Sequence, residues 1–203
     1  MAVLGLGGLL GLGWRLVSRK KYWPCPAWLA WMVEADNPLA RENRAARIVR
    51  RLKIVPGMHI LDAGCGPGRL TLPLAWAVGR SGEVVALDTQ RAMLDITLNK
   101  TRAEGLDNVR LFVAMLGQDF LPETAFDRAV LVTVLGEIPD QAHALKSLYE
   151  ALKPGGILSI TETVFDPHYQ SRASVARLAR AAGFRSKAVF GNWLAYTMHL
   201  EKN

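Results

Sequence analysis

The chain has 203 residues, half of them hydrophobic, which is enough for the core of one domain. Its two cysteines, Cys25 and Cys65, exclude a disulfide-rich scaffold, and no Cys/His cluster has metal-ligand spacing, so we predict no metal site. The net charge of +7 lies entirely within residues 1–55, where ten Lys and Arg outnumber three acidic residues. Such a basic segment suits an enzyme that acts on nucleic acid or a protein that rests on anionic lipid.

An uncharged apolar run, MAVLGLGGLLGLGW, opens the chain, and the basic residues Arg19, Lys20 and Lys21 follow it. A secretory signal has the reverse order, with its positive charge first. The run is shorter than the roughly 20 apolar residues that span a bilayer. We therefore expect an anchor that lies in or dips into a membrane, on its cytoplasmic face. A short spanning helix and a disordered or core-packed terminus are the alternatives.

The chain is rich in tryptophan directly after this run. Trp28 and Trp31 share one face of a predicted short helix with Met32 and Ala35. Indole rings prefer the headgroup level of a membrane, so this face is suited to lipid. It is equally suited to packing on the domain or covering its pocket.

The next predicted helix begins at Asn37 and Pro38 and continues to about Leu52, because Asn is a good N-cap and Pro a good first helical residue. Three arginines lie on one side of it. They are Arg44, Arg47 and Arg51. We interpret this stripe as a solvated helix face.

From residue 58 onward, strand and helix patterns alternate, which is typical of a parallel, doubly wound sheet. Strands are predicted at residues 59–64, 83–88, 109–115, 126–134 and 157–162. Helices are predicted at residues 69–78, 90–104, 142–152 and 171–182. The last two strands, 186–191 and 196–202, are joined by a short link, so we expect them to pair as an antiparallel hairpin.

The stretch DAGCGPG, which begins at Asp62, follows the first of these strands. Its glycines leave room for a ligand to approach the backbone, and the helix that follows presents free N–H groups. The Gly-x-Gly-x-x-Gly pattern of dinucleotide binding fails, because Arg69 occupies the sixth position from Gly64. The carboxylate before the glycines favours a cationic or amine-bearing ligand.

The second strand ends at Asp88. A carboxylate at this place can accept hydrogen bonds from both hydroxyls of a ribose. Taken alone, Asp88 could equally cap the helix after it. The glycine loop that precedes it in the chain favours the ribose.

These segments in their order resemble class I S-adenosylmethionine-dependent methyltransferases, and most closely the ubiquinone/menaquinone-methyltransferase-like group. The resemblance extends over about residues 40–203 and is carried by GCGPG, VVALD, FDRAVLVTVL and LKPGGILSITE. It implies an α/β, Rossmann-like, doubly wound sheet of seven strands with an antiparallel last strand, and S-adenosylmethionine as the cofactor. We divide the chain into a membrane-associating apolar or amphipathic helical segment, 1–36, and a methyltransferase domain, 37–203.

The resemblance also implies where the cofactor binds. Its methionine end would lie near Asp62, its ribose at Asp88, and its methyl group near Thr133 and Val134. The implied cofactor-binding residues are Asp62, Gly64, Cys65, Gly66, Gly68, Asp88, Thr89, Met93, Met115, Leu116, Thr133 and Val134.

One position departs from the family. An acidic or amide residue usually follows the third strand and accepts from the adenine amino group, whereas this chain has Met115. Adenine would then pack against Met115 and Leu116 and use backbone contacts. Gln118 or Asp119 could substitute if the loop folds back.

Methyl transfer from a sulfonium needs alignment, and a base only when the nucleophile is protonated. The segments after the fourth and fifth strands offer several polar side chains at the pocket mouth. They are Glu137, Asp140, Glu162, Asp166, His168 and Tyr169. We take Glu137 and His168 as the catalytic candidates, since a histidine can accept a proton near neutral pH. The alternative is that His168 is only a loop residue.

We expect a methyltransferase that acts on a small lipophilic acceptor or a lipid headgroup at an anionic membrane surface. An RNA methyltransferase that uses the basic N-terminal quarter is one alternative, and a non-catalytic scaffold is another. Nucleic acid is disfavoured as a partner because LGE follows the fourth strand, where enzymes that methylate base amines carry an Asn/Asp-Pro-Pro-Tyr signature.

Overall fold

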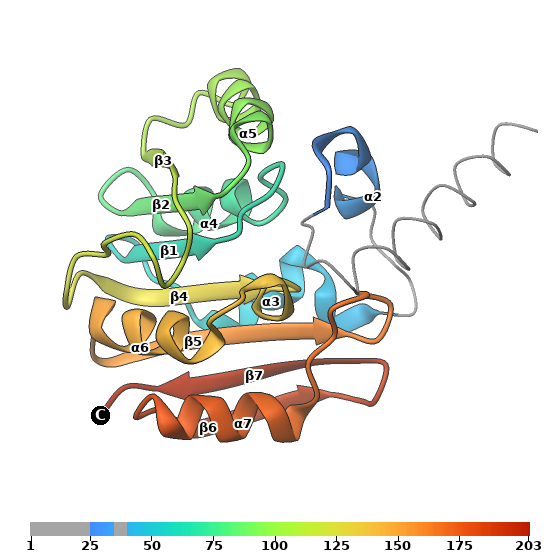
Figure 1. Cartoon of the computed structure of the whole chain (residues 1–203). Helices are drawn as coiled ribbons and strands as arrows, with labels where there is room; N and C mark the ends of the chain where they lie inside the picture. The colour runs from blue at the N-terminus through green and yellow to red at the C-terminus, as the bar shows by residue number, and fades with distance from the viewer. Residues whose placement is uncertain (1–24, 35–39) are drawn as a thin grey trace, which may run out of the picture.

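The computed structural model describes residues 25–34 and 40–203, and a seven-stranded sheet forms its centre (Figure 1). The strand order is β3-β2-β1-β4-β5-β7-β6. Strands β1 to β5 pair in parallel, and β7 is antiparallel to both of its neighbours. The predicted doubly wound sheet with a reversed last strand is therefore confirmed.

The strands are β1 (His59–Ala63), β2 (Glu83–Asp88), β3 (Val109–Val113), β4 (Phe126–Val132), β5 (Leu152–Thr163), β6 (Arg185–Gly191) and β7 (Ala195–Glu201). The described α-helices are α2 (Ala30–Glu34), α3 (Ala45–Leu52), α4 (Thr71–Val78), α5 (Arg91–Ala103), α6 (Gln141–Ala151) and α7 (Arg172–Ala181). Three short 3-10 turns are η1 (Ala27–Leu29), η2 (Arg41–Asn43) and η3 (Leu135–Glu137).

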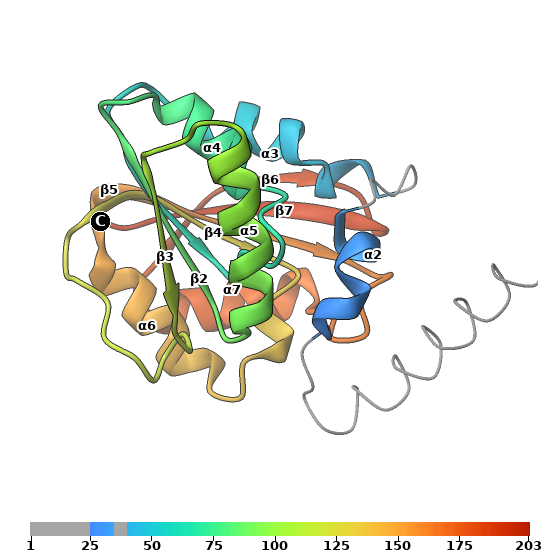
Figure 2. The same ribbon diagram turned by 90° about the horizontal axis from the view of Figure 1, so that it is seen from above.

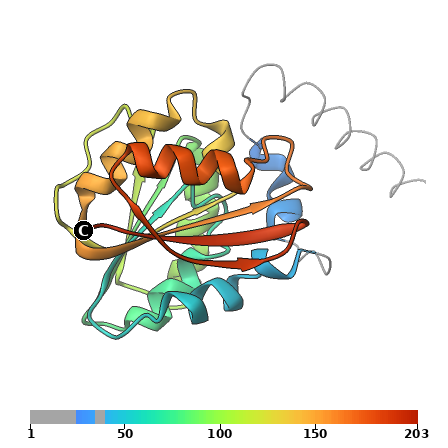
Figure 3. The ribbon, with the colours of Figure 1, turned by 90° about the horizontal axis from the view of Figure 1, so that it is seen from below.

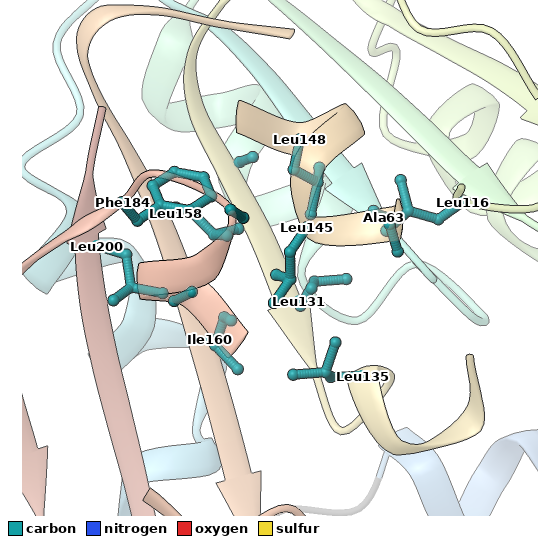
Figure 4. Packing of buried hydrophobic residues seen from close by; sticks show 14 of the residues in the cluster. Ala63, Leu116, Leu131, Leu135, Leu145, Leu148, Leu158, Ile160, Phe184 and Leu200 are labelled. Atoms are coloured by element: carbon teal, nitrogen blue, oxygen red, sulfur yellow. The ribbon is translucent and has the colours of Figure 1, made fainter. Parts of the chain in front are cut away.

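Helices cover both faces of the sheet, with α3 and α4 on one face and α6 and α7 on the other (Figures 2 and 3). The side chains of successive residues of β4 point to opposite faces of the sheet. Leu131 packs with Leu145 and Leu148 of α6 (Figure 4), whereas Val130 packs with the cluster under α3 and α4. Because both faces are buried, the central strands are almost continuously apolar.

Strand β4 ends at Val132, two residues earlier than predicted. Thr133 has a positive φ of 56°, which an extended strand does not allow. This residue turns the chain into η3, and the turn lies at the edge of the sheet where ligands bind in such folds.

The predicted helix up to Leu52 is interrupted in the described part of the chain. Arg44 is extended, with ψ of 129°, and separates η2 from α3. The interruption lets buried Glu42 accept hydrogen bonds from Arg47 and Arg51. The interpretation of the arginine stripe as a solvated face is therefore wrong for these two arginines, which hold a buried carboxylate in place.

The first described segment places its two tryptophans on the outside. Trp28 and Trp31 are 61% and 62% exposed, while Leu29 and Ala30 are buried against the domain. The apolar run at residues 1–17, Ala35, and the helix start at Asn37 and Pro38 lie outside the described residues. Within the described part, no helix is both long enough and apolar enough to cross a bilayer.

Candidate active site

The carboxyl ends of β1, β2, β4 and β5 meet at one edge of the sheet, and α2 lies beside the same edge (Figures 1 and 2). This edge gathers Asp62 at the end of β1, Asp88 at the end of β2, and Glu162 near the end of β5. Ligands of open parallel sheets bind at this place. Most of the predicted site residues therefore lie at one edge.

The glycine loop has a shape that other side chains would disturb. Gly64 has φ of +76°, and a Cβ added to it would lie 2.4 Å from Cγ2 of Val134. The N–H of Gly66 donates to Oδ2 of Asp88 at 2.9 Å, and its carbonyl accepts from Oγ1 of Thr97 at 2.9 Å. The loop is thus fixed from two neighbouring elements and leaves a bare backbone beside β4.

Asp88 links the glycine loop to the next helix. Its Oδ1 accepts from the N–H of Gln90 at 2.8 Å, directly before α5, while its Oδ2 holds Gly66. Burial raises the pKa of Asp88, and backbone N–H groups partly oppose this rise. A carboxylate has about four lone-pair sites, so acceptor capacity remains for a ribose hydroxyl.

Asp62 is a buried carboxyl under the loop. Oγ1 of Thr71, the first residue of α4, donates to its Oδ2 at 2.7 Å. Burial raises the pKa of Asp62 to about 6, against the opposing effects of Thr71 and the charge of Arg69. A ligand with a positive group would favour the ionised form of this side chain.

The two catalytic candidates lie on loops that pack directly on each other. Thr133 N–H donates to the Thr161 carbonyl at 2.9 Å, which fixes the turn into η3 and Glu137. Gly136 lies so close to the backbone of His168 that an added Cβ would come within 1.8 Å of its carbonyl oxygen. The structure therefore brings the Glu137 loop and the His168 loop together at the end of β4 and β5.

Carboxyl groups dominate the electrostatics of this side of the site. Burial raises the pKa of Glu137 to about 8, and the charges of Asp166 and Asp88 add to the rise. Burial also raises the pKa of Glu162 to about 8, with further contributions from Asp166 and Glu137. Burial and neighbouring carboxyl groups therefore favour the protonated form of both side chains.

Other predicted residues contribute mainly through packing. Cys65 is buried with Ala86 and Leu94, and burial raises the pKa of its thiol, so it is not a ready thiolate. Met93 is buried on α5, whereas Thr89 is exposed.

The loop after β3, which contains Met115, is held by contacts with residues close to it in the sequence and with the core. Asp119 accepts from the N–H of Met115 at 2.7 Å, and Leu116 packs into the core cluster that contains Ala63 and Leu87. Asp140 caps α6 by accepting from the N–H of His143 at 2.9 Å.

Several structural contacts of the site carry no signal in the sequence. Thr97 reaches back to Gly66 across 31 positions, and Gln90 Nε2 donates to the Cys25 carbonyl at 2.8 Å. Lys100 Nζ donates to the Pro67 carbonyl at 3.0 Å and pairs with Glu34 of α2. These contacts tie the segment 25–34 to the glycine loop, so this segment covers one side of the site.

Comparison with known proteins adds independent evidence. A family model described as a methyltransferase domain matches residues 60–156. A demethylmenaquinone methyltransferase of Geobacillus stearothermophilus is 36% identical over 116 residues, which cover 57% of this chain and 50% of that protein. The ubiquinone/menaquinone biosynthesis C-methyltransferase UbiE of Vibrio vulnificus (strain YJ016) is 34% identical over 116 residues, which cover 55% of this chain and 45% of that protein.

Among solved structures, a SAM-dependent methyltransferase from Aquifex aeolicus has a TM-score of 0.78 and 21% identity, over 89% of this chain and 100% of that one. At this identity the likeness supports the fold. The chain spans about half the length of the curated relatives it matches. The matched methyltransferase domain, the strand order and the glycine loop agree: the chain has the fold of S-adenosylmethionine-dependent methyltransferases, and it is similar in sequence to the ubiquinone and menaquinone methyltransferases.

Proposed function

We propose that this protein transfers a methyl group from S-adenosylmethionine to a small lipophilic acceptor that it meets at the cytoplasmic face of a membrane. The observation that carries the proposal is the glycine loop held by Asp88 at the shared edge of β1, β2 and β4. The names of the relatives, which act in menaquinone and ubiquinone synthesis, support a lipophilic acceptor.

The residues at this edge fit the cofactor. Gly64 packs directly on Val134, so a side chain at this position would displace the turn after β4 that borders the cofactor site. Asp62 offers a buried carboxyl to the ammonium group of the methionine end, and Asp88 offers free acceptor capacity to the ribose. When bound, S-adenosylmethionine supplies an electrophilic methyl group on a positively charged sulfur.

Residues of the chain would then align the acceptor and take up its proton. The turn at Thr133 and Val134 would line the methyl group and set the direction from which the acceptor approaches. Glu137 and His168, on the two packed loops, would face the acceptor and could receive a proton from it. Alignment is the larger requirement, because methyl transfer is an in-line displacement.

The surface beside the site supports delivery from a membrane. Trp28 and Trp31 are exposed on the segment that covers the glycine loop. Trp193, 75% exposed, lies in the link between β6 and β7, whose Leu194 carbonyl accepts from Val164 after the end of β5.

Three exposed indoles therefore belong to segments at the edge of the sheet that carries the site. Indoles of this kind favour the headgroup region. The basic excess of residues 1–55 and the apolar run at the start of the chain belong to the same end of the sequence.

A direct test has two stages. The full chain should bind S-adenosylhomocysteine in a calorimetric titration, since this product occupies the same site. The chain should then transfer label from methyl-labelled S-adenosylmethionine into a lipid extract. Absence of binding would overturn the assignment of the cofactor. Label that enters total RNA instead of the lipid fraction would establish the RNA alternative.

A further inference from the structure

The carboxyl of Glu162 has an unusual position within the site. The residue is 1% exposed, its Oε2 accepts from the N–H of Gln170 at 3.2 Å, and its Oε1 has no hydrogen-bond partner among the described residues. A buried polar atom without a partner costs free energy, so a group that binds to it is expected.

The direction of this side chain follows from the alternation along β5. Leu158 and Ile160 belong to the core cluster on the α6 and α7 face, together with Leu135 of η3. Glu162 follows them at the same period of two, so it faces the same side, toward η3.

Glu137 lies at the end of η3, next to Gly136, which packs on the backbone of His168. Gln170 joins this loop to Glu162, because its side chain donates to the His168 carbonyl and its N–H donates to Glu162. In agreement with this arrangement, the charge of Glu137 raises the pKa of Glu162.

The carboxyl groups of this region favour a cationic ligand. The charges that raise the pKa of Glu137 and Glu162 are those of other carboxyl groups, Asp166 above all. A bound anion would be repelled, whereas a bound cation would relieve the mutual repulsion. The described part of the chain contains no cluster of His, Cys, Asp or Glu suited to a metal ion, so an organic cation is the better match.

An aromatic wall adjoins the two carboxyls. Tyr196 pairs with Glu162 across β5 and β7, and its hydroxyl donates to the Gln170 carbonyl at 2.7 Å. The rings of Tyr196 and Tyr169 meet edge to face, with centroids 6.2 Å apart. Aromatic faces attract cations, and the guanidinium of Arg172 already lies 5.3 Å from the centroid of the Tyr196 ring.

We propose that Glu137 and Glu162 form the acceptor subsite and that the group they bind is a primary or secondary amine of a lipophilic acceptor. This rests on the proposed methyl transfer and names its acceptor atom as nitrogen. The family match ends at residue 156, so Glu162 lies beyond the matched segment, whereas Glu137 lies within it.

The proton balance of the step is simple. The acceptor enters as an ammonium ion, and one of its protons moves to the carboxylate of Glu162, which leaves a lone pair on nitrogen. The nitrogen then forms a bond to the methyl carbon as the carbon–sulfur bond breaks, with the bonding pair remaining on sulfur. The nitrogen regains a positive charge, the sulfur becomes a neutral thioether, and Glu162 returns its proton to water.

The experiment uses three probes of equal chain length: octylamine, octanol and octanoate. Each is titrated calorimetrically into the full chain saturated with S-adenosylhomocysteine. Octylamine should bind at least about tenfold more tightly than octanol, the factor expected for about 1.4 kcal/mol of charge-assisted hydrogen bonding, and octanoate should bind most weakly. Titration in two buffers of different ionisation enthalpy should show proton release with octylamine alone, because an ammonium ion favours the ionised carboxyls.

Matched variants identify the residues. Glu162→Gln keeps the size of the side chain and an acceptor for Gln170, so the fold should persist while the preference for octylamine over octanol disappears. Glu104→Gln, at an exposed position after α5, should keep the full preference. Equal binding of octylamine and octanol by the unaltered chain, or an unchanged preference in Glu162→Gln, would overturn the inference. Because S-adenosylhomocysteine affinity is measured first, a failure of the cofactor assignment is seen separately.

Discussion

Oδ2 of Asp88 accepts a hydrogen bond from the N–H of Gly66 at 2.9 Å, and this contact joins the end of β2 to the loop after β1. The sequence suggests a role toward a ligand or as a cap of the next helix for this carboxylate, but not the contact with Gly66. In the structure it also shapes the loop that would receive the ligand. A change at Asp88 therefore acts on the cofactor site in two ways.

Asp88→Asn should weaken binding of S-adenosylhomocysteine by about 1–3 kcal/mol, the usual effect of removing one partner from charge-assisted or buried hydrogen bonds. The new amide group places a donor where either Gly66 or Gln90 now donates. Calorimetry measures the affinity. Asp95→Asn, at an exposed position on α5, is the control and should bind normally. Normal binding by Asp88→Asn would move the ribose contact elsewhere.

Gly64→Ala should abolish cofactor binding. An alanine at φ of +76° carries backbone strain of about 1–2 kcal/mol, and its Cβ would also collide with Val134. Gly105→Ala provides a control with similar strain, since Gly105 has φ of +65° but no neighbour within 4 Å of an added Cβ. The control should bind the cofactor, and thermal unfolding should show both variants folded. Binding by Gly64→Ala comparable to that of Gly105→Ala would mean that the close packing of Gly64 on Val134 is not needed for the cofactor.

The free protein should lose stability as the pH rises from about 5 to about 8, and the loss should level off above this range. The pKa of both Glu137 and Glu162 is about 8 in the folded state, above the ordinary value of 4.5. Between these values the folded state keeps protons that the unfolded state has released, so unfolding becomes more favourable as pH increases.

The unfolding temperature, followed by circular dichroism, tests this expectation. The double variant Glu137→Gln and Glu162→Gln should show a flatter profile over this range, because neither amide titrates. An equally steep profile in the double variant would show that other groups cause the loss.

Replacing Trp28, Trp31 and Trp193 together by alanine should reduce binding of the full chain to anionic liposomes. The three indoles are exposed on segments at the edge that carries the site, and each offers ring area to the headgroup region. Flotation of the protein with liposomes measures the bound fraction. Trp76→Ala is the matched control, since Trp76 is 53% exposed on α4. Equal losses in the two proteins would contradict a membrane surface at the site edge.

The predictions of fold were accurate because they used local patterns. Alternating strands and helices, the glycine loop and the final hairpin are encoded by periodicity and turn residues that lie close together in sequence. The errors arose where a specific contact, which periodicity does not encode, decided the local structure. Arg47 and Arg51 form ion pairs with buried Glu42, whereas the sequence pattern predicts a solvent-exposed basic face. The turn at Thr133 ends β4 earlier than the apolar pattern predicts.

The sequence by itself determined the sheet, its reversed last strand and the edge at which Asp62, Asp88 and the glycines gather, because the carboxyl ends of parallel strands must share one edge. Only the tertiary structure decided which groups touch there. Thr97 meets Gly66, Cys25 meets Gln90, and Glu162 comes under the influence of Glu137 from other elements of the chain. Burial and the charges of spatial neighbours set the pKa of a carboxyl, and both depend on packing between segments that lie far apart in the sequence.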